Sequence, residues 1–103
     1  VLNCEQIKDV LTIEKVARAV GDYYGVSMKD FLSSARNQRV SSARHVAIYM
    51  SRELTEKSFE SIADFFHKKH TTMLYSYEKI KGELKTNKEL ENSIYEIRRN
   101  IEQ

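Results

Sequence analysis

The sequence has no proline, three glycines and one cysteine among its 103 residues. Because proline and glycine interrupt regular helices, their scarcity favours uninterrupted helical segments. The single cysteine, Cys4, excludes an internal disulfide and a cysteine-based metal cluster. No apolar run reaches the length that a bilayer crossing needs, and no signal peptide is recognisable, so we expect no membrane-spanning segment and a cytoplasmic location.

Apolar residues make up 41% of the chain and charged residues 31%, with a net charge of only +2. This length and composition suffice for one hydrophobic core, so we expect a single domain covering residues 12–103. Residues 1–11 are expected to be a linker or the end of a helix from a preceding domain, because the chain starts with Val1 and resembles a fragment of a longer protein. Any electrostatic binding surface must be local rather than spread over the whole chain.

Apolar residues recur at helical spacing, and strict alternation is absent, so the sequence predicts a compact all-α domain of about six helices. The first helix is expected to end at Gly25, in a C-terminal cap. The expected helix-capping residues are Thr12, Ser27, Ser41 or Ser42, Ser58 and Thr86. The corresponding segments are 12–25, 27–34, 41–55, 58–66, 70–84 and 86–103. In segment 70–84 the residues expected to face the core are Met73, Leu74, Tyr77, Ile80 and Leu84.

Segments 58–66 and 70–84 are separated by three residues, which is the spacing of a helix-turn-helix motif. Lys68 and Lys69 lie in this junction, and no acidic residue occurs from Phe65 to Tyr77. The start of a helix offers free N–H groups and a positive partial charge to phosphates. The junction is therefore a candidate for DNA binding, and a simply solvated turn is the alternative.

A second tract without acidic residues runs from Phe31 to Arg52. Arg36 and Arg39 are expected in a polar loop, where a guanidinium can reach phosphates or a narrow minor groove, and Arg44 in the first turn of the next helix. Basic residues in separate elements together indicate a nucleic-acid interface.

The blocks "SIADFFHKKHTTMLYSYEKI" and "SSARHVAIYMSRELT" resemble the C-terminal DNA-binding domain, domain IV, of the bacterial chromosomal replication initiators of the DnaA family. The resemblance runs from about residue 11 to residue 80. It implies a Trp-repressor-like helix-turn-helix domain with an added basic loop, which recognises DnaA-type boxes in double-stranded DNA of the replication origin. It also implies an upstream AAA+ domain that binds ATP, self-association through the rest of the protein and a nucleoid-associated location.

Carried over by position, the resemblance assigns base reading to the start of the second helix of the motif and further DNA contacts to the loop and the preceding long helix. Threonine methyl and hydroxyl groups suit this role, because they contact thymine methyls and base edges. The expected DNA-binding residues are Arg36, Gln38, Arg39, Arg44, His45, Lys68, Lys69, His70, Thr71 and Thr72.

The chain also departs from the family pattern at several of these positions. The family usually has a Gly-Gly-Arg-Asp type of turn, whereas here only three residues separate Phe66 from His70. Lys69 replaces the Asp of the family. Because a lysine can only donate hydrogen bonds, the preferred box can differ. Gln38 stands where the family has its minor-groove arginine; either Arg39 substitutes for it or minor-groove reading is weakened. His45 replaces a common glutamine.

Other function classes find little support in the sequence. No phosphate-binding glycine loop, nucleophile elbow or carboxylate pair is readable, so we expect no catalytic residues and no cofactor in this chain. His67 and His70 alone do not predict a metal site, and Thr71 has a helix cap as its structural alternative. A DnaA-like motif in a transcription regulator or mobile-element protein stays open as an alternative. So does a protein-binding helical module that uses the apolar stripe in "LENSIYEIRRNI".

Overall fold

The computed structural model describes residues 12–33 and 37–102. Within these residues the chain forms six helices and no strand, which confirms the predicted all-α class. The helices are α2 (Ile13–Tyr24), α3 (Met28–Leu32), α4 (Gln38–Thr55), α5 (Phe59–Phe66), α6 (His70–Glu83) and α7 (Lys88–Glu102). The predicted linker over residues 1–11 lies outside the described residues. No helix in the described part of the chain has the length and hydropathy that a membrane crossing requires.

Three of the predicted helix starts are confirmed by their capping hydrogen bonds. The side chains of Thr12, Ser27 and Ser58 each accept a hydrogen bond, at 3.2 Å, from the backbone N–H three residues further on. Gly25 ends α2 in the left-handed conformation, with φ of 70°. The local signals therefore fix these ends as sequence reasoning predicts.

Two predicted starts are wrong, because an asparagine is the cap in each case. The side-chain oxygen of Asn37 accepts from the N–H groups of Arg39 and Val40, at 2.8 and 3.2 Å, so α4 begins at Gln38 rather than near Ser41 or Ser42. Gln38 and Arg39 are thus helical, and Arg44 lies in the second turn of α4 rather than in the first. Similarly, Asn87 and not Thr86 accepts from the N–H of Leu90, at 3.0 Å, at the start of α7.

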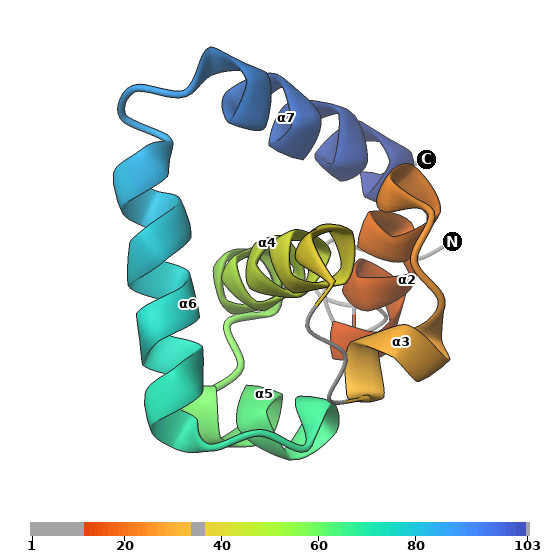
Figure 1. The fold of residues 1–103 in the computed structure, drawn as a ribbon, viewed down its shortest axis with the longest axis vertical. Helices are drawn as coiled ribbons and strands as arrows, with labels where there is room; N and C mark the ends of the chain where they lie inside the picture. The colour runs from red at the N-terminus through yellow and green to blue at the C-terminus, as the bar shows by residue number, and fades with distance from the viewer. Residues whose placement is uncertain (1–11, 34–36, 103) are drawn as a thin grey trace, which may run out of the picture.

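Helix α4 passes through the middle of the fold, between α2 on one side and α6 on the other (Figure 1). Helix α5 lies beside one end of α6, and α7 follows its other end and returns to α2 (Figure 1). All six helices contribute side chains to one core. Its fully buried large residues are Val16, Val20, Phe31, Val46, Ile48, Met50, Ile62, Phe66, Met73 and Ile97.

The C-terminal helix α7 closes this core over α2. Ile97 is fully buried, and the Tyr23 hydroxyl donates to the Ser93 hydroxyl at 3.2 Å between the two helices. Leu90, Ile94 and Ile101 are partly buried against the core. The apolar stripe of this segment therefore packs against the core of the same chain.

Candidate nucleic-acid interface

Helices α5 and α6 are joined by a three-residue turn, as the helix-turn-helix spacing predicts. His67 adopts the left-handed conformation, with φ of 57°, and the N–H of Lys68 donates back to the Ala63 carbonyl at 3.0 Å. This arrangement ends α5 and reverses the chain at once. The aromatic ring of Phe59 lies 5.5 Å from that of Tyr77 and 6.1 Å from that of His70, between ring centroids, so the two helices are fixed against each other.

The first turn of α6 is exposed and polar. Lys69 occupies the N-cap position without a side-chain capping bond, and His70, Thr71 and Thr72 follow as the first three helical residues, all exposed. Thr71 is therefore not the cap, and that structural alternative is wrong. Because the Lys69 side chain makes no capping hydrogen bond among the described residues, the N–H groups and positive partial charge of this helix end are available to an anionic partner.

Further along α6, one side of the helix is buried and the other is exposed. Met73, Ser76 and Ile80 are buried against the core, whereas Tyr75 is 63% exposed. Leu74 is 47% exposed, so its predicted inward position is wrong. Tyr75 lies four residues after Thr71, the spacing at which two helical residues share a face.

The start of α4 presents two of the expected contacts. Gln38 and Arg39 are exposed at its first two positions, next to the Asn37 cap. Their place in a first helical turn gives them a fixed backbone, which the predicted loop would not have given. Arg36 lies outside the described residues.

Two other expected contacts, Arg44 and Lys68, both bind the backbone of Ser33. The Ser33 carbonyl accepts from Arg44 Nη2 at 3.2 Å and from Lys68 Nζ at 3.0 Å. These bonds join α4 and the α5–α6 turn to the end of α3. The two acid-free segments of the sequence, around residues 31–52 and 65–77, are thus held together in the fold.

His45 points into the interface between α4 and α6. Its Nδ1 lies 2.8 Å from the hydroxyl of Ser76, and its ring meets that of Tyr75 edge to face, with centroids 6.2 Å apart. Burial lowers the pKa of His45, and the charges of Lys79 and Arg44 lower it further against the opposing effect of Glu83. The neutral imidazole is therefore favoured.

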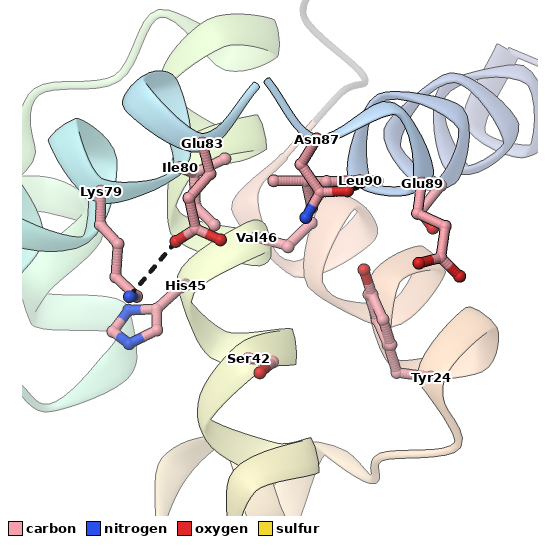
Figure 2. A pocket seen from close by; sticks show the side chains of 11 residues that line it. Tyr24, Ser42, His45, Val46, Lys79, Ile80, Glu83, Asn87, Glu89 and Leu90 are labelled. Carbon is pink, nitrogen blue, oxygen red and sulfur yellow. Dashed lines mark hydrogen bonds and ion pairs between the residues drawn. The ribbon is translucent and has the colours of Figure 1, made fainter. Parts of the chain in front are cut away.

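Next to His45 lies a pocket of about 260 Å³ between α2, α4, α6 and α7 (Figure 2). Lys79 and Glu83 form an ion pair at its edge, at 3.2 Å, and Tyr24, Asn87 and Glu89 line its other walls (Figure 2). Among the described residues, no three His, Cys, Asp or Glu side chains are grouped as metal ligands would be.

The helices that carry this surface match a known family. Residues 13–80, which include the whole of α2 to α5 and most of α6, match the family described as "Bacterial dnaA protein helix-turn-helix". The chain belongs to this family. The DnaA helix-turn-helix domain thus accounts for the resemblance seen in the two sequence blocks, whereas α7 follows the matched residues.

Individual relatives agree with the family assignment. The "Chromosomal replication initiator protein DnaA" of Caldanaerobacter subterraneus subsp. tengcongensis is 35% identical over 91 residues, which cover 88% of this chain and 20% of that protein. Proteins of the same name from Thermoanaerobacter sp. (strain X514) and Thermoanaerobacter pseudethanolicus match with the same identity and coverage. The chain therefore spans about a fifth of the length of these DnaA relatives.

Proposed function

We propose that this chain binds double-stranded DNA sequence-specifically, as the domain of a replication initiator that recognises DnaA-type boxes in the origin. The observation that carries the proposal is the exposed, polar and uncapped start of α6, which follows directly on the basic turn. A helix presented in this way after a short turn fits the major groove of B-form DNA.

In this proposal the start of α6 reads bases. His70, Thr71 and Thr72 are exposed on the first turn, where the recognition helix of such motifs enters the groove. Threonine methyl groups contact thymine methyls, and the imidazole and hydroxyl groups hydrogen-bond to base edges. Lys69, exposed immediately before them, adds a positive charge for phosphate or guanine.

The start of α4 supplies the second contact region. Arg39 and Gln38 are exposed there, and we assign Arg39 to a phosphate or to the adjacent minor groove, together with Arg36. Lys68 of the turn and Arg44 of α4 bind the same Ser33 carbonyl, which links α4 to the turn of the motif. We assign Arg44, His45 and Lys68 to the same interface, because each contacts a backbone or side chain that borders it.

The rest of the proposed initiator lies outside this chain. We assign ATP binding to an upstream AAA+ domain, and self-association to the rest of the full-length protein. The chain itself then acts without a cofactor and directs the initiator to the nucleoid.

The decisive experiment is a salt titration of binding between the 103-residue chain and two duplexes, one with a DnaA-type box and one with the same base composition in scrambled order. We expect tight binding to the box duplex, weaker binding to the scrambled duplex, and a log–log salt slope whose magnitude grows by roughly 0.9 per phosphate contact.

Other outcomes lead to the alternatives. Equal binding to both duplexes would contradict box recognition and favour a DnaA-like motif with another target, as in a transcription regulator or mobile-element protein. No binding to either duplex at low salt would contradict DNA binding altogether.

A further inference from the structure

Helix α3 ends without the left-handed residue that ends α2 and α5. It has only five residues, and the chain leaves it at Ser33 in an extended conformation, with φ of −85° and ψ of 176°. By contrast, α2 and α5 end at residues in the left-handed conformation, Gly25 and His67. The last carbonyl groups of a helix have no donors within the helix. The Asp30 carbonyl accepts from the N–H of Ser33 at 3.3 Å and from its hydroxyl at 2.8 Å, and further donors reach this end of α3 from α4.

Arg44 supplies these donors from α4. Its Nε donates to the Phe31 carbonyl at 3.1 Å, and its Nη2 lies 3.2 Å from the carbonyls of Asp30 and of Ser33. A planar guanidinium presents several N–H groups in a fixed geometry, which lets Arg44 serve three carbonyls from one position. Partial burial of the side chain lowers the pKa of Arg44, as expected when a cation is partly removed from water.

The same end of α3 is also held by the helix-turn-helix turn. Lys68 Nζ donates to the Ser33 carbonyl at 3.0 Å across a sequence separation of 35 residues. Beneath this bond, the buried rings of Phe31 and Phe66 meet edge to face, with centroids 6.1 Å apart. One polar and one apolar contact therefore fix the end of α3 to the end of α5 and the turn that follows it.

We infer that Arg44 is a positioning residue of the DNA interface, acting through the Ser33 carbonyl that it shares with Lys68. The inference rests on the proposed function. Arg44 of α4 and Lys68 of the α5–α6 turn both bind this carbonyl. The two bonds therefore fix the position of the end of α3 relative to the start of α6. The position expected to contact DNA directly thus acts through the backbone, by keeping the two contact regions in register.

The test uses Arg44→Lys, which keeps the charge and loses the fork, and Arg44→Gln, which loses the charge. Arg18→Lys is the matched control, since Arg18 is exposed on α2 and, within the described part of the chain, pairs with Glu14 on its own helix. Each variant is titrated with salt against the box and scrambled duplexes, below its own unfolding temperature as measured by circular dichroism.

A positioning role predicts that Arg44→Lys loses about tenfold in affinity for the box, the scale of lost charge-assisted hydrogen bonds. Its affinity for the scrambled duplex and its salt slope should remain those of the wild type, as should all values for Arg18→Lys. A direct phosphate contact predicts instead that Arg44→Lys behaves as the wild type, and that Arg44→Gln loses affinity for both duplexes with a slope smaller by roughly 0.9. That result would overturn the inference.

The ratio of box to scrambled affinity distinguishes a positioning role of Arg44 from a purely structural one. A purely structural role would lower the unfolding temperature of Arg44→Lys but leave the ratio of box to scrambled affinity of the folded protein unchanged, which would also overturn the inference. If the wild type itself shows no preference for the box, the proposed function fails and the inference fails with it.

Lys68→Met gives a second route that does not require Arg44 to be changed. It removes the other donor to the Ser33 carbonyl, so we expect a loss of box selectivity in the same direction. The double variant Arg44→Lys with Lys68→Met should lose less box selectivity than the sum of the two single losses, because both side chains act at one carbonyl. Fully additive losses would contradict a shared positioning point.

Discussion

The Nδ1 atom of His45 and the hydroxyl of Ser76 lie 2.8 Å apart across the contact between α4 and α6. Ser76 is fully buried, four residues after Thr72 on the helix that we propose to read DNA. This hydrogen bond therefore fixes the rotation of α6 about its own axis. His45, which is expected to contact DNA, thus also orients α6 through this bond.

The His45 site predicts a pH dependence of stability. The folded-state pKa of His45 is lowered by burial and by Lys79 and Arg44, with Glu83 opposing, so near pH 6 the unfolded chain binds more protons than the folded chain. Stability should be complete above the unfolded-state pKa of about 6.5 and should fall as the pH drops toward the lower folded-state pKa. Thermal melts between pH 5 and 8 measure this loss.

His45→Gln is the control for this effect. Glutamine retains hydrogen-bonding groups but does not titrate, whereas the exposed His67 and His70 remain in both proteins. We expect the variant to lose less stability than the wild type between pH 7.5 and pH 5.5. Equal losses in the two proteins would assign the pH dependence to other groups.

Two fully buried serines provide a matched pair of substitutions. Within the described part of the chain, the Ser51 hydroxyl has no hydrogen-bonding partner, whereas that of Ser76 bonds to His45. Ser51→Ala removes an unsatisfied polar group and should be neutral or stabilising, by up to about 1 kcal/mol. Ser76→Ala leaves the imidazole without its partner and should cost about 1–3 kcal/mol.

Urea denaturation of both serine variants tests this contrast. Alanine is the better helix former, so helix propensity favours both substitutions equally and does not explain a difference between them. If Ser76→Ala were as stable as Ser51→Ala, the His45–Ser76 hydrogen bond would contribute nothing to the α4–α6 contact.

Sequence reasoning recovered the helices and the turn of the motif because these depend on local signals. Ser58 and Gly25 act within one turn of their own helix, and so does the apolar spacing around Ile62. The start of α4 was misplaced because Asn37 and Ser41 are both good caps, and the choice depends on Val40, whose burial in the core is a tertiary fact.

The roles of the basic residues were harder to predict than their positions. Sequence shows that Arg44 and Lys68 are basic and lie in acid-free tracts, but the Ser33 carbonyl that both bind lies 11 and 35 residues away. Whether a cation faces solvent or completes a helix end depends on the packing of α3, which no local pattern encodes. Lys69 and Thr72, in contrast, are exposed as the motif predicts.

Thr72 and Lys69 should separate base reading from phosphate binding. Thr72→Ala removes a methyl and a hydroxyl from the exposed first turn of α6, and should cost roughly 1–3 kcal/mol on the box duplex and much less on the scrambled duplex. Lys69→Ala should weaken binding to both duplexes alike and reduce the salt slope by roughly 0.9. Binding isotherms at several salt concentrations measure both effects.

Lys88→Ala on α7 controls for the loss of a surface charge, since Lys88 is exposed and pairs with Glu91 on its own helix. It should leave the slope and both affinities unchanged. Equal losses for Thr72→Ala on the two duplexes would refute a base-reading role for Thr72.

Two glycines should respond oppositely to alanine. A Cβ atom at Gly21 would clash with the Val26 carbonyl oxygen and lie 3.1 Å from the ring of Phe31, whereas a Cβ at Gly82 would meet no atom within 4 Å. The chain closes tightly on Gly21, because the N–H of Val26 donates to the Gly21 carbonyl at 2.9 Å. Gly21→Ala must therefore shift backbone at the α2–α3 connection and should cost about 1–3 kcal/mol.

Gly82 lies in the last turn of α6, where alanine restricts the unfolded chain and favours the helix. Gly82→Ala should therefore stabilise the domain by about 0.5–1 kcal/mol, measured by the same denaturant titration. Because α3 begins two residues after Val26, Gly21→Ala should also disturb the position of the Ser33 carbonyl, and with it box selectivity. A Gly21→Ala protein with wild-type stability would show that the α2–α3 connection yields easily and does not fix α3.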